Sequence, residues 1–331
     1  MKRIVAWSLG ILALTVMAAV AFVELRNHRG VLDAEAKFAA ERPAPIQDLG
    51  ITQTLTILPL IDWHVSDPGL RGEMGVSYLV ETDGHRILFD VGHNAARESP
   101  SPLEHNMRAL GVSLDSIDTI FISHNHFDHV GGKERQKNET FSVGIEQAPL
   151  PGVRAFVPIP MTYPGLDPVH SSAPMQIGEG LATTGTIPRQ LVFGWIDEQA
   201  LVVNVAERGA VLIVGCGHQT IPKLLERYDE VFDEPLYGIF GGLHFPVPEG
   251  RLKVLGLNAQ RVFASGTGML SPISMDQVTE EMNELRRRNL GLVGVGGHDS
   301  SDEVIAMFSE MFGDAYRHVR VGERIVIAQP E

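Results

Sequence analysis

Short apolar runs recur along most of the chain and predict the strands of buried sheets. Each is only a few residues long and apolar on both faces, a pattern typical of strands covered on both sides. The runs lie at residues 54–61, 76–81, 86–91, 119–123, 153–157, 201–205, 211–214, 236–240, 292–295 and 324–328. We therefore expect the folded part to begin near residue 53 and to be rich in β-sheet.

Three helices are predicted between these runs by their start and stop signals. Each begins with a serine that is followed three residues later by Glu or Gln, and each ends at or just before a glycine. The signals are Ser101 with Glu104 before Gly111, Ser274 with Gln277 before Gly291, and Ser300 with Glu303 before Gly313. The single apolar stripe of each helix predicts that one side lies on a sheet. Residues 132–180 are instead rich in proline, which favours a loop that covers a functional site.

The N-terminus forms a separate element. Residues 4–23 carry no charge and, as a helix, are long enough to cross roughly 30 Å of hydrocarbon. Lys2 and Arg3 favour a cytoplasmic N-terminus, which places the rest of the chain in the periplasm or at the extracellular face. Retention as a membrane anchor is slightly favoured over signal cleavage after Ala21, and a buried core helix is a third interpretation. We expect an anchor or signal at residues 1–23, a polar linker at 24–50 and one domain at 51–331.

Composition narrows the classes of partner and site. The chain has 41 acidic and 27 basic residues, a formal net charge of −14, so it lacks the basic surface that nucleic acid requires. The single cysteine, Cys216, excludes an intrachain disulfide and a cysteine-based zinc knuckle. Thirteen histidines leave imidazole and carboxylate as the expected donors of any metal site.

The densest chemical signal directly follows the strand predicted at residues 119–123. His124, His126, Asp128 and His129 fall within six residues. Side chains two positions apart on an extended segment point to the same side, so His124 and His126 can reach one ion. A turn after them can direct Asp128 and His129 at a second ion, and the glycines at 131 and 132 suit such a turn. The pattern predicts a dinuclear metal site.

Three later histidines each follow an apolar strand across one or more glycines. They are His218 after residues 211–214, His244 after residues 236–240, and His298 after residues 292–295. We predict His218 and His298 as metal ligands and His244 as a ligand or proton donor. The alternative is a capping or buried structural role for His218, and a hydrogen-bonded pocket histidine for His244.

The segment from His124 to His129 resembles the His-x-His-x-Asp-His hallmark of the metallo-β-lactamase superfamily. Other segments are similar to a subfamily named for a dihydropterin-methyl-ribofuranosyl-aminobenzene-phosphate synthase, and they lie at residues 75–81, 87–92, 106, 110–112, 184–189, 197–201, 215–218, 241–244 and 298. The resemblance covers roughly residues 53–328. It implies an α/β (α+β) fold, an αββα sandwich of two mixed β-sheets flanked by helices, with two metal ions at one edge.

The chain departs from that subfamily beside the histidines rather than at them. Gly217, Thr186 and Asp299 stand where the subfamily usually has Ser, Glu and Cys. Such neighbours orient ligands and shape the pocket, so the departures leave the substrate open. Asp90 resembles the superfamily's buried carboxylate that holds a ligand imidazole, and Cys216 is expected to be a small buried residue beside the metal.

The resemblance implies metal-assisted hydrolysis. Two divalent ions, most simply Zn²⁺ with iron or manganese also compatible, would generate a metal-bound hydroxide that attacks a small ester, lactone, lactam, thioester or phosphoester. Asp128 would bind one ion and orient the nucleophile, while His244 would complete a site or protonate the leaving group. The first site would comprise His124, His126 and His218, and the second Asp128, His129 and His298.

A noncatalytic metal- or ligand-binding protein on the same scaffold is the alternative function. It would lack an open coordination position. A true β-lactamase is disfavoured because the chain resembles the synthase-named branch, and flavin-dependent redox chemistry is disfavoured because no flavin-binding domain is fused here. The expected partners are a small-molecule substrate and, through the N-terminal helix, a membrane.

Overall fold

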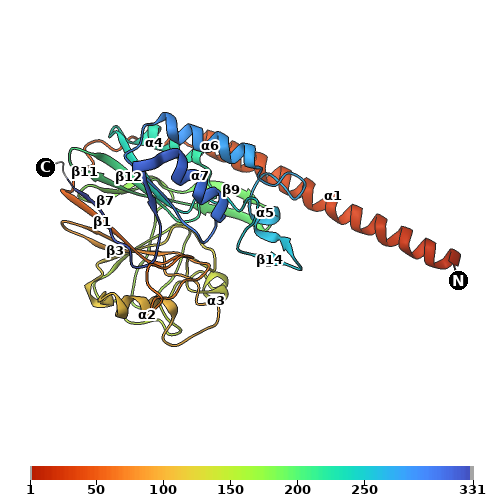
Figure 1. Cartoon of the computed structure of the whole chain (residues 1–331), viewed down its shortest axis with the longest axis horizontal. Coiled ribbons are helices and arrows are strands. Elements are labelled where there is room, and N and C mark those ends of the chain that lie inside the picture. The colour runs from red at the N-terminus through yellow and green to blue at the C-terminus, as the bar shows by residue number, and fades with distance from the viewer. Residues whose placement is uncertain (1, 329–331) are drawn as a thin grey trace.

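The computed structural model describes residues 2–328, with side chains described from residue 7 onward, and shows two large sheets between two layers of helices (Figure 1). The first sheet has the order β18-β1-β2-β3-β4-β5-β6. Its strands are β1 (Thr54–Ile61), β2 (Ser77–Thr82), β3 (Arg86–Phe89), β4 (Thr119–Phe121), β5 (Arg154–Val157), β6 (Val169–His170) and β18 (Ile325–Ala328). The strands from β18 to β3 are antiparallel, and those from β3 to β6 are parallel.

The second sheet has the order β17-β16-β13-β12-β11-β8-β7. Its strands are β7 (Met175–Gly178), β8 (Leu181–Thr183), β11 (Leu201–Val205), β12 (Gly209–Val214), β13 (Leu236–Gly241), β16 (Leu292–Val295) and β17 (Tyr316–His318). The strands β12, β13, β16 and β17 pair in parallel. Two hairpins stand apart from the large sheets: β9 (Ile187–Leu191) with β10 (Gly194–Glu198), and β14 (Lys253–Val254) with β15 (Leu257–Asn258).

Three apolar layers hold the sandwich together. The inner faces of the two sheets meet at residues such as Phe89, Phe121 and Phe240. Helices α4, α6 and α7 cover the outer face of the second sheet, and α2 covers the first (Figure 1). This is the αββα sandwich of two mixed sheets that the resemblance implied, and burial on both faces explains the short, wholly apolar strands.

The helices include the three predicted from sequence signals. They are α1 (Lys2–Ala40), α2 (Pro102–Ala109), α3 (Lys133–Lys137), α4 (Ile221–Val231), α5 (Ala259–Ala264), α6 (Met275–Arg287) and α7 (Asp302–Phe312), with 3-10 turns at Leu114–Ser116 and Gly313–Ala315. Helices α3, α4 and α5 were not predicted, and α3 lies within residues 132–180, expected to be loop. Both predicted capping boxes of α2 and α6 form. The cap of α7 is Ser301 rather than Ser300, and α4 has no side-chain cap at Thr220, which is why no start signal marked it.

The first helix is much longer than its apolar part. Within the described side chains, the segment from Trp7 to Ala40 includes a window of mean hydropathy 2.2 in which no residue is buried. By length and composition this helix could cross a membrane, and a signal sequence would look the same. Residues 24–40, expected to belong to a polar linker, continue the helix and pack on the domain, with Ala34 and Phe38 buried.

Candidate metal centre

Side chains from both sheets meet at one edge of the sandwich. The strands β3 and β4 are parallel neighbours in the first sheet, as are β12, β13 and β16 in the second. The carboxyl ends of parallel neighbours lie at the same edge of a sheet. The loops that follow these strands carry Asp90, the run His124 to His129, His218, His244 and His298. Neighbouring imidazole rings in this cluster have centroids 4.1–5.5 Å apart.

The group predicted as the first metal site is compact. One ring nitrogen each of His124, His126 and His218 lies within 4.8 Å of the other two, and His124 Nε2 is 3.1 Å from His126 Nδ1. Burial lowers the pKa of all three imidazoles, that of His126 to about 4. They are therefore neutral at physiological pH, which is the form that binds metal.

Asp90 sets the orientation of two of the imidazoles. Its carboxylate accepts hydrogen bonds from the Ser123 N–H at 2.7 Å, the Ser123 hydroxyl at 2.7 Å and His129 Nδ1 at 2.6 Å. Because the hydroxyl donates to Asp90, it can accept from His124 Nδ1, which is 2.9 Å away. Both His124 and His129 then present Nε2 to the cluster, as a metal ligand requires.

That arrangement needs an unusually close approach between the sheets. A Cβ atom at Gly215, after β12, would meet Ser123 Oγ at 2.1 Å and Asp90 Oδ2 at 3.2 Å.

Gly131 has φ of +88°, and a Cβ there would meet the Ser142 carbonyl oxygen at 2.2 Å. The tight turn predicted after the histidine run is confirmed at this glycine.

Cys216 lies in the middle of the cluster. Its Sγ atom is 3.1 Å from His129 Nε2 and 3.3 Å from His298 Nε2. It shares one group of possible ligands with His124 and His129, a second with His218 and His244, and a third with His298 and Asp299. The expectation that only imidazole and carboxylate surround a metal here was too narrow, because a thiol is among the possible donors.

Carboxylates surround His298. Asp62 Oδ2 is 3.8 Å from its Nδ1, and Asp299 Oδ2 is 3.6 Å from its Nε2. Burial lowers the pKa of His298, but Asp299, Asp62 and Asp128 outweigh that effect and raise the pKa to about 9. This side of the cluster therefore stabilises positive charge, as a cation site must.

The turn that carries Cys216 and His218 is held by a buried carboxylate. Glu198, at the end of β10, accepts hydrogen bonds from the backbone N–H groups of Cys216, Gly217 and His218 at 2.8–2.9 Å. Burial raises the pKa of Glu198 to about 7, and these three hydrogen bonds oppose the rise. The carboxylate thus holds the backbone of this loop and makes no hydrogen bond to the His218 imidazole.

His244 lies at the same edge and faces the same space. It has a positive φ of 54°, which is uncommon outside glycine and typical of constrained functional sites. Its N–H donates to Asp299 Oδ2 at 3.0 Å, and its ring centroid is 4.2 Å from that of His218. The structure therefore brings His244 to the cluster but leaves both predicted roles, ligand and proton donor, open.

Asp128 is buried beside the cluster without joining one of its compact groups. No set of three donors with mutual distances within 4.8 Å among residues 7–328 contains it. Its Oδ1 atom has no hydrogen-bond partner within the described chain. Burial raises the pKa of Asp128 to about 6. The predicted second group of Asp128, His129 and His298 is thus brought to one region, with Cys216 between the two histidines.

Two pockets open onto the cluster from either side of the β9–β10 hairpin. A pocket of about 190 Å³ is lined by His218, His244 and Arg189, and one of about 270 Å³ is lined by His126 and Trp195. Leu191 lines both. We call His126, His218 and His244 the open half of the cluster, and His129, Cys216 and His298 the anchored half.

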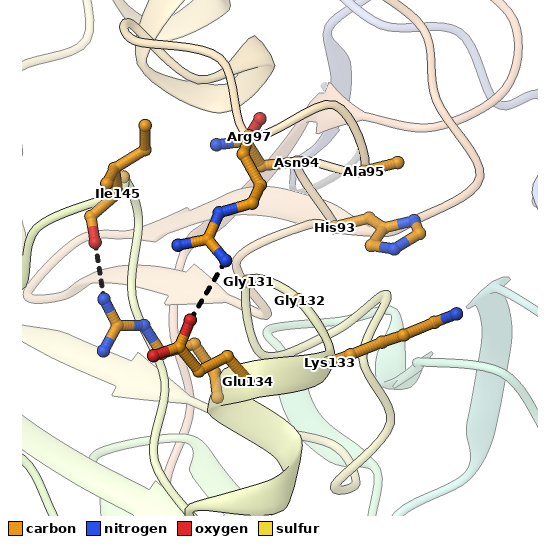
Figure 2. Close-up of a pocket in the computed structure, with 11 residues that line it drawn as sticks. His93, Asn94, Ala95, Arg97, Gly131, Gly132, Lys133, Glu134 and Ile145 are labelled. Carbon is orange, nitrogen blue, oxygen red and sulfur yellow. Dashed lines mark hydrogen bonds and ion pairs between the residues drawn. The ribbon is translucent and has the colours of Figure 1, made fainter.

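A further pocket lies behind the histidine run and does not reach the ligand candidates. It has a volume of about 380 Å³ and is lined by Gly131, Gly132 and neighbouring charged residues. Figure 2 shows Arg97 reaching across it to Glu134, an ion pair of 3.2 Å. None of the cluster's histidines lines this pocket as the structure describes it.

Sequence reasoning assigned no role at the site to Asp62 or Glu198, expected Asp299 only as a neighbour of a ligand, and expected Cys216 beside the metal but not as a donor. Asp62, Glu198 and Asp299 hold ligand candidates or their loops, and Cys216 lies among them. The available signal was position, since Asp62 directly follows β1 and Glu198 ends β10. Charged residues at buried strand ends are rare unless they are paired or functional.

Comparisons with known proteins agree with this architecture. The sequence profile of the metallo-beta-lactamase superfamily matches residues 70–137, which include the histidine run. The solved structure of Tm1679, described as a metal-dependent hydrolase of the beta-lactamase superfamily, has a TM-score of 0.55 and 19% identity, and the match covers 83% of this chain and 100% of that one. The resemblance to the metallo-β-lactamase superfamily that the sequence showed is confirmed, and the protein has that superfamily's fold.

Curated proteins are also similar in sequence, among them the following two. The 7,8-dihydropterin-6-methyl-4-(beta-D-ribofuranosyl)-aminobenzene-5'-phosphate synthase of Methanocaldococcus jannaschii is 26% identical, over 51% of this chain and 70% of that protein. The anti-Pycsar protein Apyc1 of Bacillus phage 010DV004 is 44% identical over 59 residues, 18% of this chain and 20% of that protein. The first similarity agrees with the subfamily resemblance, but a synthase and an anti-Pycsar protein do not define one reaction.

Proposed function

We propose that this protein is a dinuclear metal-dependent hydrolase of a small ester, lactone, lactam, thioester or phosphoester. The observation that carries the proposal is a set of buried ring nitrogens without hydrogen-bond partners. Both ring nitrogens of His218 and of His244 lack a hydrogen bond within residues 7–328, although the side chains are buried. Polar atoms left in this state cost free energy unless an ion or substrate completes them.

The donor set fits two divalent ions. His124, His126 and His218 would hold one, and His129, His298 and Cys216, with Asp128 close by, would hold the other. Imidazole and thiolate together favour zinc, while imidazole and carboxylate also suit iron or manganese. When bound, such ions lower the pKa of a water molecule to near neutrality and polarise the substrate oxygen.

The chain's own residues supply proton handling and orientation. Because burial raises the pKa of Asp128 to about 6, its carboxylate can position an attacking water and accept its proton near neutral pH. His244 lines the pocket beside His218, where it can give a proton to the leaving group. Asp90 keeps Nε2 of His124 and His129 directed at the cluster.

We place this activity outside the cytoplasm. The apolar part of α1 would anchor the chain in the membrane, with the domain in the periplasm or at the extracellular face. The long exposed apolar window of α1 supports this placement, and so do the basic residues Lys2 and Arg3 ahead of it.

The test is metal content measured together with hydrolysis. We would purify the full chain in detergent, reconstitute it with zinc, and assay chromogenic phosphoesters, esters, lactones and lactams. Wild type is expected to bind two ions per chain, and His126→Ala and His298→Ala are each expected to lose ion and activity together. The exposed His28 on α1 offers a matched control, and His28→Ala should match wild type.

Two results would count against the proposal in different ways. Full metal loading without hydrolysis of any probe would favour a noncatalytic binding protein on this scaffold. Loading that is unchanged by His298→Ala would show that the second group of ligands is assigned wrongly.

A further inference from the structure

Exposed apolar side chains gather on the side of the domain from which α1 emerges. Leu255, at the turn between β14 and β15, is 98% exposed, and Leu257 and Leu270 are 71% and 75% exposed. Phe193, at the tip of the β9–β10 hairpin, is 66% exposed. We call Phe193, Val254, Leu255, Leu257 and Leu270 the apolar rim. Such a concentration is unusual on a surface that only water covers.

Hydrogen bonds tie this rim to the end of the apolar helix. The Leu270 N–H donates to Glu24 Oε1 at 2.8 Å, and the side-chain amide of Asn27 donates to the Thr267 carbonyl oxygen. Glu24 is the first charged residue after the uncharged run of residues 4–23. Leu270 therefore lies at the level where α1 passes from its apolar to its polar part.

The other rim residues belong to elements joined to the same corner. The ring of Phe193 is 5.2 Å from that of Phe263 in α5, and α5 directly follows the β14–β15 hairpin in the chain. Figure 1 shows β14 and α5 on the side of the domain from which the N-terminal part of α1 protrudes. The rim therefore lies on the same side of the domain as the apolar part of the helix.

The loop at residues 265–270, which follows α5 and carries Leu270, forms a wall of the pocket at His218 and His244. Ser265, Gly266 and Thr267 line the pocket that contains His218 and His244. The segment that meets α1 at Asn27 is therefore also the segment that borders the open half of the cluster.

We propose that the apolar rim rests on the bilayer that α1 crosses, so that the pocket at His218 and His244 opens at the membrane surface. The occupant of the rim is the lipid of that same bilayer. A helix that leaves the bilayer near Glu24 brings Leu270 to the headgroup region, and a rigid domain brings the hairpin tip with it. Arg26 and Arg29, exposed on the first turns beyond the apolar run, suit lipid phosphates at that level.

This placement also specifies the kind of substrate. A pocket whose mouth lies in the headgroup region receives molecules that partition into a membrane more readily than molecules free in water. It therefore fits an amphiphile whose hydrolysable polar group projects from the bilayer. This consequence rests on the proposed hydrolase, whereas contact of the rim with lipid does not.

Depth-dependent quenching tests the contact without requiring turnover. The full chain would be placed in phosphatidylcholine nanodiscs containing spin-labelled lipid, with one polarity-sensitive fluorophore on a cysteine introduced as Leu255→Cys, Thr267→Cys or Glu207→Cys. Glu207 is exposed at the turn between β11 and β12, away from the rim. Wild type serves as the labelling blank, because Cys216 is buried.

The proposal predicts strong lipid quenching and a blue-shifted emission at position 255, intermediate quenching at 267, and none at 207. Equal and negligible quenching at 255 and 207 would overturn it. Quenching at 255 in a protein that hydrolyses no probe would leave the membrane contact standing and would count only against the proposed reaction.

Discussion

The two halves of the histidine cluster are built differently. In the anchored half, His129 is bonded to the buried Asp90 at 2.6 Å, and His298 lies between Asp62 and Asp299. In the open half, His218 has no hydrogen bond to either ring nitrogen in the described chain, and it borders a pocket. The difference separates two roles. Ligands held by carboxylates are fixed in orientation and suit holding a metal ion, whereas imidazoles without hydrogen bonds are free to contact a substrate in the pocket.

The largest expected effect comes from Asp90→Asn, which removes one of the two carboxylate oxygens that accept hydrogen bonds from Ser123 and His129. Each buried donor left without an acceptor costs about 1–3 kcal/mol, and losing such a support weakens metal binding about 10–100-fold. Urea unfolding and zinc competition titration would measure both. Asp115→Asn, at an exposed aspartate, is the control and should change neither. Wild-type zinc affinity in Asp90→Asn would mean that the anchored half is anchored by something else.

The second prediction concerns a carboxylate bordering the open half. Burial raises the pKa of Glu281 from 4.5 to about 7 in the folded protein. Between these values the folded state binds more protons than the unfolded state, so its contribution to stability is present below about pH 4.5 and is lost as the pH rises to about 7. Glutamine does not titrate, so Glu281→Gln should not show this loss of stability with rising pH.

We therefore expect the free energy of unfolding of Glu281→Gln, relative to wild type, to rise by up to about 3 kcal/mol between about pH 4.5 and pH 8. Urea unfolding at both pH values, at constant zinc, measures it. Glu280→Gln changes the exposed neighbour on α6 and should give no pH-dependent difference. A pH-independent difference for Glu281→Gln would show that Glu281 titrates normally.

Much of the fold was predictable because its strands are short and buried on both faces. The predicted runs at 54–61, 201–205 and 292–295 coincide with β1, β11 and β16. The edge strands β6 and β7 were missed, because exposed residues such as His170 and Gln176 break the apolar pattern. Residues 24–40 were expected as linker because their polar composition hides a face that packs on β9.

The site likewise combines residues that one loop supplies with residues that only the folded chain brings together. The run from His124 to His129 is visible in sequence because one loop supplies it. Asp62 and Glu198 act across more than one element, so only the folded chain brings Asp62 to His298 and Glu198 to the Cys216 turn. Cys216 was expected beside the metal but not as a donor. Its proximity to His298 depends on how β12 and β16 pair with β13, and its proximity to His129 depends on how the two sheets pack.

The third prediction tests whether Cys216 joins the anchored half as a donor. Cobalt-loaded wild type should show a thiolate-to-cobalt charge-transfer band in the near ultraviolet, and Cys216→Ser should lose the band and bind one ion at least about tenfold more weakly. His126→Ala, in the open half, should keep the band. A cobalt-loaded wild type without the band would remove Cys216 from the ligand set.

The smallest expected effect lies at the wall of the open half. Asn27 of α1 donates to the Thr267 carbonyl oxygen, and Asn27→Ala should lower the free energy of unfolding by about 1 kcal/mol. Because Thr267 lines the pocket with His218 and His244, KM for any hydrolysed probe should rise, while the cobalt band of the anchored half stays unchanged. Urea unfolding, steady-state kinetics and the cobalt spectrum measure the three, with the neighbouring His28→Ala as the control. A weakened cobalt band in Asn27→Ala would show that the two halves are mechanically coupled, and that the anchored half depends on the helix that holds the pocket wall.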